Sequence, residues 1–161
     1  LACGTGRMSL MLLEQNWFAK NLNSSIEAVD FSEGMLKKFE VSLHKLDEEL
    51  RNKVIIQRMD LSDMNNWSAK ADSSYDFVSL MEVGEFLPGF AAIVQQVSRV
   101  LRPGSLFLLS KPPEWMGALY PGRHQTAKDL KALLLKNGFE SVEIKPWTER
   151  YEIVYAIKGN T

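Results

Sequence analysis

The chain has 161 residues, of which 45% are hydrophobic and 24% charged, and its formal net charge is −1 at pH 7. This length suits one domain with a substantial core and is short for two, so we expect a single domain over residues 1–161. A charge so close to zero argues against a general nucleic-acid surface, and no apolar run approaches the roughly 18 residues of a membrane span. The single cysteine, Cys3, has no partner for an internal disulfide, which is compatible with a reducing compartment; the cytoplasm is the default expectation.

The first seven residues, LACGTGR, form a glycine-rich turn around which we expect the rest of the chain to be organised. Gly4 and Gly6 have no Cβ, so the backbone can turn tightly and a flat, polar ligand can lie against it. The apolar-faced stretch from Arg7 to Lys20 predicts a helix that leaves the turn. Open α/β sheets bind ligands where a strand passes into a helix, so the turn is a candidate ligand site.

Predicted strands and helices alternate along the remaining sequence. A helix with a break near Asp47 is expected from Ser32 to Leu50, a second over 90–101, and a third that a Thr126–Asp129 capping box opens. The predicted strands are 26–30, 54–59, 75–81, 105–110, 139–147 and 151–157. This order predicts an α/β fold with a doubly wound, mostly parallel, seven-stranded Rossmann-like sheet and a C-terminal antiparallel hairpin.

The sequence begins with Leu1 inside what should be a strand-to-turn unit. We therefore expect the first strand to be largely missing and the domain to be incomplete at its N-terminus. Two neighbouring strands would then face a gap with unpaired backbone groups, so the 161 residues alone are expected to be poorly soluble or molten.

Three features fall at the ends of successive predicted strands: the glycine turn, Asp30 and Asp60. The carboxyl ends of parallel strands share one edge of a sheet, so two carboxylates and a bare backbone turn should converge on one crevice. Asp also favours ordinary turns, but such joint placement is hard to obtain by chance.

With these motifs the whole chain resembles the class I methyltransferases that use S-adenosylmethionine. The residues that carry the resemblance are 1–7 (LACGTGR), 29–36 (VDFSEGML), 58–61 (RMDL), 75–78 (YDFV), 99–104 (RVLRPG) and the predicted helix over 130–139. The resemblance implies that S-adenosylmethionine is the cofactor, that no metal is needed, and that the enzyme transfers a methyl group to an acceptor, most simply a small molecule.

The resemblance also implies a role for each residue at the adenosine end of the cofactor. Asp30 would accept hydrogen bonds from both ribose hydroxyls, because an ionised carboxylate can take two donors. Phe31 and Met35 would pack on the adenine. Asp60 would accept a hydrogen bond from the adenine amino group, and the Leu61 backbone would contact the ring.

At the methionine end, the resemblance implies contacts from the glycine turn and from the residues that follow the strand over 75–81. The residues concerned are Ala2, Gly4, Thr5, Gly6, Met81 and Glu82. Ala2 departs from the family, which usually has its first glycine there.

A general base is required only if the acceptor atom is protonated at working pH. The candidates are Glu82, Glu85 and His124. Phe86 stands where many members carry a histidine after the glutamate that Glu85 matches, so members that use this histidine as a base are poor guides to this chain.

The acceptor pocket is expected to include the loop from Lys111 to Gln125. Four of its side chains could line an apolar or aromatic site, or could simply cover the sheet: Trp115, Met116, Tyr120 and Arg123. The sequence does not choose the acceptor or the oligomeric state.

Two other functions stay open on the sequence. A nicotinamide-dependent oxidoreductase shares the Gly-x-Gly turn and an acid after the second strand, although Ser9, Asp60 and the closing hairpin argue against it. The other is a module that binds the cofactor or a partner without catalysis.

Overall fold

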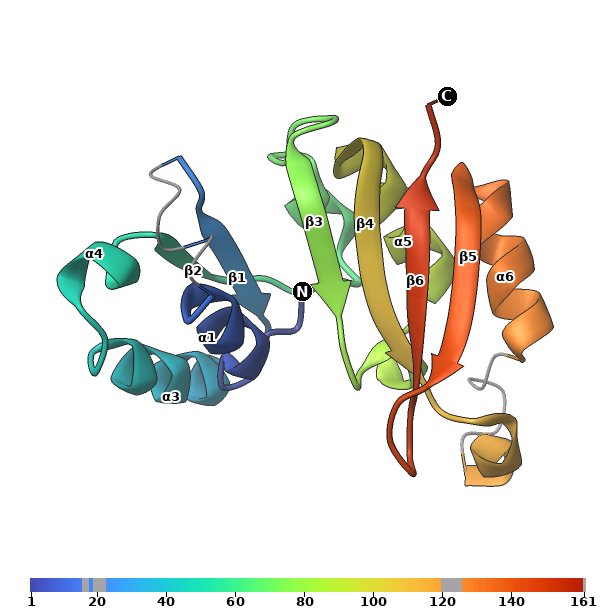
Figure 1. The fold of residues 1–161 in the computed structure, drawn as a ribbon, viewed down its shortest axis with the longest axis horizontal. Coiled ribbons are helices and arrows are strands. Elements are labelled where there is room, and N and C mark those ends of the chain that lie inside the picture. Colours follow the sequence, from blue (N-terminus) through green and yellow to red (C-terminus); the bar gives the residue numbers. More distant parts are fainter. Residues whose placement is uncertain (16–17, 19–22, 120–125, 161) are drawn as a thin grey trace. The chain divides into compact units, whose positions relative to one another are not determined.

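The structure is a computed structural model that describes residues 1–15, 18, 23–119 and 126–160. It contains two compact units, Leu1–Leu61 and Ser62–Thr161, and each has its own sheet and core (Figure 1). No helix in the described residues is both long and apolar enough to cross a membrane. The expectation of one domain over the whole chain stays a prediction.

The first unit is built on two parallel strands. Strand β1 (Ile26–Asp30) pairs with β2 (Val54–Arg58) in a continuous register from Ile26 opposite Val54 to Asp30 opposite Arg58. The helices are α1 (Arg7–Leu13), α3 (Glu33–Leu43) and α4 (Glu48–Arg51). The predicted break near Asp47 is confirmed, because Asp47 is the N-cap residue of α4.

One apolar cluster joins α1, β1 and α3. It contains Leu13, Phe18, Ala28, Phe39 and Leu43, all buried. Both helices therefore pack on β1, and the glycine turn that precedes α1 is held close to the end of that strand.

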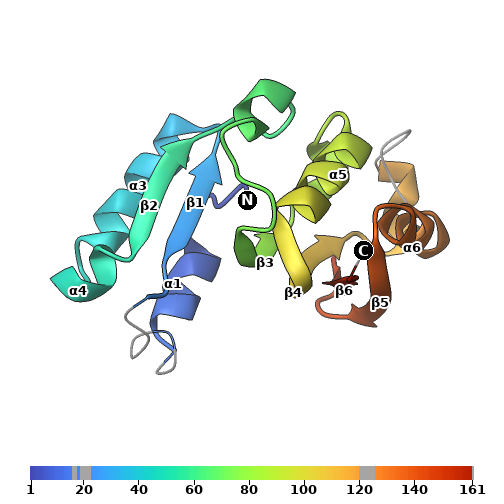
Figure 2. The ribbon, with the colours of Figure 1, turned by 90° about the horizontal axis from the view of Figure 1, so that it is seen from above.

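The second unit is a four-stranded sheet in the order β3-β4-β6-β5. Strand β3 (Tyr75–Leu80) runs parallel to β4 (Leu101–Lys111), and β6 (Glu152–Lys158) lies antiparallel between β4 and β5 (Phe139–Pro146). The predicted C-terminal hairpin with one reversed strand is confirmed. Figure 2 shows the same sheet from above.

Helices α5 (Phe90–Val100) and α6 (Ala127–Lys136) pack against this sheet and against each other. The rings of Phe107 and Phe139, on β4 and β5, lie 5.7 Å apart between their centroids in the core. The capping box of α6 is confirmed, because the Asp129 backbone N–H donates to Thr126 Oγ1 at 3.1 Å. Short turns of 3₁₀ helix complete the unit: η1 (Met64–Trp67), η2 (Gly84–Phe86) and η3 (Glu114–Leu119).

Strand β4 is longer than the sequence predicts. It begins at Leu101, directly after α5, and its pairing with β3 shifts register between Tyr75, opposite Leu101, and Phe77, opposite Leu106. Gly104 lies in this bulge with a φ of 78°. The Arg-Pro-Gly sequence ends the helix as expected, and the bulge lets the chain enter the sheet without a separate loop.

The six described strands and their alternation with helices give the expected α/β fold. Among the described strands, β1 pairs only with β2, and β3 only with β4. The Cys3 N–H donates to the Val29 carbonyl at 2.8 Å, so the chain entering the glycine turn lies beside β1.

Candidate functional site

The glycine turn has a backbone conformation that L-residues rarely adopt. Ala2, Gly4 and Gly6 all have positive φ, at 47°, 55° and 80°. The Gly6 N–H donates to the Cys3 carbonyl at 2.9 Å, which closes the turn. The strain at Ala2, the only non-glycine of the three, marks a position where the surrounding structure imposes the conformation.

The two glycines are needed for different reasons. A Cβ on Gly6 would lie 1.9 Å from Cδ2 of the buried Phe39 ring, so Gly6 permits close packing of the turn on α3. A Cβ on Gly4 would meet no atom within 4 Å. Gly4 therefore faces open space, where a ligand can approach the backbone.

Asp30 links the end of β1 to this turn. Its side chain accepts hydrogen bonds from two backbone N–H groups, that of Gly4 to Oδ2 at 2.8 Å and that of Ser32 to Oδ1 at 2.9 Å. The residue is 6% exposed. Each carboxylate oxygen accepts more than one hydrogen bond, so both oxygens keep capacity for ligand hydroxyls.

Two apolar side chains beside Asp30 are exposed to solvent. Phe31 is 69% exposed and Met35 is 41% exposed. Ser32, the N-cap of α3, accepts a hydrogen bond from the Met35 N–H at 3.4 Å, and Arg58 Nε donates to the Phe31 carbonyl at 3.2 Å. These bonds fix the backbone that carries Phe31 and Met35. The two side chains form a small apolar surface that a flat ring could cover.

The segment after β2 lies next to the end of β1. The Met59 N–H donates to the Asp30 carbonyl at 3.0 Å, and Met59 and Leu61 are both 3% exposed. Asp60, between these two anchors, is exposed. The structure thus brings the glycine turn, Asp30 and the Asp60 segment together at one end of the first unit, as the sequence predicts.

Cys3 lies in the same turn. Burial raises the pKa of its thiol to about 11. The thiol therefore stays protonated at neutral pH, and Cys3 has the character of a small apolar residue that packs against the α1–β1–α3 cluster.

The remaining predicted site residues lie in the second unit, after β3. Met81 is half-buried and Glu82 is exposed, with a φ of 59°. The Glu82 N–H donates to the buried Ser110 Oγ at 2.6 Å. Sequence reasoning missed Ser110, because nothing local to β4 indicates that its hydroxyl supports a turn 28 residues earlier.

Glu85, on η2, is 4% exposed. Its Oε1 accepts a hydrogen bond from the Tyr151 hydroxyl at 2.9 Å, and its Oε2 has no hydrogen-bond partner among the described residues. Sequence reasoning also missed Tyr151, which lies 66 residues from Glu85 along the chain.

The predicted acceptor loop is only partly described. Trp115 is 72% exposed, whereas Met116 is 8% exposed and belongs to the core. His124, Tyr120 and Arg123 lie outside the described residues.

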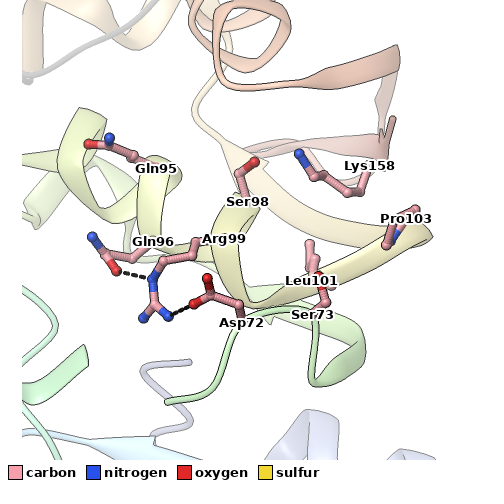
Figure 3. Close-up of a pocket in the computed structure, with 9 residues that line it drawn as sticks. All are labelled: Asp72, Ser73, Gln95, Gln96, Ser98, Arg99, Leu101, Pro103 and Lys158. Atoms are coloured by element: carbon pink, nitrogen blue, oxygen red, sulfur yellow. Dashed lines mark hydrogen bonds and ion pairs between the residues drawn. The ribbon is translucent and has the colours of Figure 1, made fainter. Parts of the chain in front are cut away.

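A separate hollow of about 430 Å³ lies at the opposite end of the second unit's sheet, beside the start of β4 (Figure 3). Its main cation, Arg99, donates to Gln96, Asp72 and the carbonyls of Lys70 and Trp67. Arg99 is thus occupied in holding η1 to α5, and ligands of open α/β sheets bind at the other edge. The described residues contain no group of three metal-ligating side chains.

Residues 1–109 match a protein family described as methyltransferase domain. The chain belongs to this family. Its fold is that of the class I methyltransferases dependent on S-adenosylmethionine. Among curated proteins, none matches the chain significantly in sequence.

Solved structures share the fold of this methyltransferase domain at low sequence identity. An S-adenosylmethionine-dependent methyltransferase from Methanosarcina mazei is 20% identical, with a TM-score of 0.72, over 99% of this chain and 91% of that one. The 4+2 cyclase SpnF is 16% identical, with a TM-score of 0.76, over 99% and 74% of the two chains. A possible exported protein from Bordetella parapertussis is 14% identical, with a TM-score of 0.73, over 98% of this chain. This chain spans 60% of the Bordetella protein's length.

The residues of the first unit fit S-adenosylmethionine. The open space at Gly4 admits a ligand against bare backbone, Asp30 offers acceptors to a pair of hydroxyls, and Phe31 with Met35 offers an apolar surface to an adenine ring. The family match favours this cofactor over the nicotinamide alternative.

Proposed function

We propose that the protein binds S-adenosylmethionine through the end of β1 and the glycine turn, and transfers its methyl group to a small-molecule acceptor by in-line displacement. The observation that carries the proposal is the bond between Gly4 N–H and Asp30 Oδ2, at 2.8 Å. It joins an open glycine backbone, proposed to lie beside the methionine part, to a carboxylate with free acceptor capacity for the ribose hydroxyls.

Each residue has a distinct binding role in this proposal. Asp30 accepts the ribose hydroxyls, Phe31 and Met35 cover one face of the adenine, and Asp60 accepts from the adenine amino group while the Leu61 backbone contacts the ring. The turn and the end of β3 border the methionine part through Ala2, Gly4, Thr5, Gly6, Met81 and Glu82.

S-adenosylmethionine supplies a methyl group on a positively charged sulfur, which is already activated for displacement. The chain's main contribution is then orientation, which can supply about 7–11 kcal/mol of barrier reduction in favourable cases. Where the acceptor atom is protonated, Glu82, Glu85 and His124 are the candidates to take the proton.

A small acceptor is the simplest partner for this chain. Its net charge of −1 provides no basic field for nucleic acid. The acceptor would lie between the loop that begins at Lys111 and the turn after β3. The proposal places the protein in the cytoplasm and assigns no oligomeric state.

Calorimetry on the full-length protein tests the cofactor. We expect binding of S-adenosylmethionine and S-adenosylhomocysteine but not of NAD. Asp30→Asn should weaken both by about tenfold or more, because an amide donates where the carboxylate accepts. Asp47→Asn is the matched control, since the exposed Asp47 side chain makes no capping bond.

Binding of NAD without S-adenosylmethionine would contradict the proposal. A radiolabelled methyl-transfer screen over hydroxyl, amine and thiol compounds then tests catalysis. Tight cofactor binding without turnover on the whole panel would favour a non-catalytic module.

A further inference from the structure

The second unit contains a buried carboxylate that the cofactor site does not use. Glu85 is 4% exposed, and of its two carboxylate oxygens only Oε1 has a hydrogen-bond partner among the described residues, the Tyr151 hydroxyl at 2.9 Å. A buried acceptor without a donor is destabilising, and more so when it is charged. Such atoms are rare in native proteins, and a role in catalysis or in binding a water or ion is among the explanations for them.

This carboxylate lies at the functional edge of its sheet. β3 and β4 are parallel, so their carboxyl ends share one edge, and the pairing of Lys111 with Glu152 brings the start of β6 to the same edge. Figure 1 shows the turn after β3 and the β5–β6 connection at this end of the sheet. Open α/β sheets bind ligands there.

The turn that carries Glu85 is fixed from two sides. Glu82 has a left-handed φ of 59° and is held by its bond to the buried Ser110 hydroxyl. Tyr151 is fixed in turn, because its N–H donates to Thr148 Oγ1 at 3.0 Å and its carbonyl accepts from the Thr148 N–H at 2.9 Å. The carboxylate is therefore preorganised, which lowers the entropic cost of binding.

The chemistry of the site selects the ligand. A carboxylate only accepts hydrogen bonds, so its partner must be a donor. Lys111, at the same edge, is already paired with Glu152 at 2.6 Å and with the Pro112 carbonyl at 2.8 Å. Phe86, next to Glu85 on η2, is 50% exposed and offers an apolar surface.

We propose that Glu85 binds the methyl acceptor, with Oε2 accepting a hydrogen bond from a hydroxyl or amine of a small molecule whose apolar part lies against Phe86. That this ligand is the methyl acceptor rests on the proposed function. That Glu85 binds a hydrogen-bond donor does not. Tyr151 and Ser110 are positioning residues, since they act through Glu85 and Glu82.

Phenol and anisole test the site on the full-length protein, because they share a ring and only phenol has a donor. Dissociation constants from ligand-observed NMR should show phenol binding at least about tenfold more tightly than anisole. Glu85→Gln should reduce this preference, because a neutral amide oxygen accepts a weaker hydrogen bond than a charged carboxylate. Glu149→Gln, an exposed glutamate of the β5–β6 connection, should leave it unchanged.

Equal affinities for phenol and anisole in the unmodified protein, no binding of either, or an unchanged preference in Glu85→Gln would each overturn the proposal. If Glu85→Gln does not fold, nuclear Overhauser contacts between bound phenol and the Phe86 ring test the site in the unmodified protein, and their absence overturns the proposal. Calorimetry with S-adenosylmethionine separates the two ideas. If the cofactor does not bind but the preference for phenol is intact, only the proposed function is rejected. If the cofactor binds but the preference for phenol is absent, only ligand binding by Glu85 is rejected.

Discussion

At the scale of single residues, the glycine turn separates packing from ligand access. A Cβ added at Gly6 would overlap the Phe39 ring, and one added at Gly4 would meet no atom within 4 Å, although both glycines have positive φ. A sequence pattern gives the two glycines equal weight. In the structure, Gly6 packs against the core, whereas the open side of Gly4 is left for a ligand.

This difference predicts that the same substitution at the two glycines has different effects on stability and on cofactor binding. Gly6→Ala should cost about 2–4 kcal/mol in the free energy of unfolding, because overpacking adds to the left-handed strain. Gly4→Ala should cost only about 1–2 kcal/mol from the backbone alone, yet weaken cofactor binding. Urea denaturation and calorimetry measure the two effects, and equal stability losses would contradict the assigned contacts.

At the scale of elements, Arg99 fastens η1 to α5. Its guanidinium donates to the carbonyls of Trp67 and Lys70 at 2.9 and 2.8 Å, to Gln96 at 2.8 Å, and to Asp72. Arg102 makes one exposed ion pair with Asp76, at 2.5 Å. The planar guanidinium of arginine has several donors and can satisfy all the acceptors of Arg99, whereas the ammonium group of a lysine cannot.

We therefore expect Arg99→Lys to destabilise the protein by about 2–4 kcal/mol, since it leaves several of these acceptor oxygens without a donor. Arg102→Lys should change stability by less than about 1 kcal/mol, as for other exposed pairs. Thermal denaturation of the two variants compares them directly. Similar melting temperatures would show that the carbonyl contacts contribute little.

Sequence patterns predict those elements whose signals are local. The capping box at Thr126 and the helix break at Asp47 each depend on residues within one turn, and both are confirmed. The start of β4 at Leu101 was missed because Pro103 and Gly104 favour a loop locally, while pairing with a distant strand decides the matter. The Glu85–Tyr151 bond is non-local in the same way.

At the scale of the whole molecule, the candidate cofactor residues are distributed over both compact units. Gly4, Asp30 and Asp60 belong to Leu1–Leu61, and Met81 and Glu82 belong to Ser62–Thr161. The sequence could place each of them next to a strand end because strand patterns are local. It could not supply the hydrogen bonds that fix each turn.

Bound S-adenosylmethionine should slow amide exchange in two segments of the first unit, one around Gly4 and one around Ser32, whose N–H groups donate to Asp30. The melting temperature should rise with ligand concentration, by the equivalent of about 2.7 kcal/mol at 100 times the dissociation constant. Hydrogen exchange with mass spectrometry resolves the segments. Protection of neither segment would contradict the binding roles of the glycine turn and Asp30.

The double attachment of Asp30 constrains how this protein can be redesigned. The carboxylate that the proposal assigns to the ribose also accepts the Gly4 and Ser32 N–H groups, so a substitution made to accept an altered ribose would also loosen the turn. Selectivity for synthetic cofactor analogues is better sought at Phe31 and Met35, whose exposed side chains tolerate change without disturbing the scaffold.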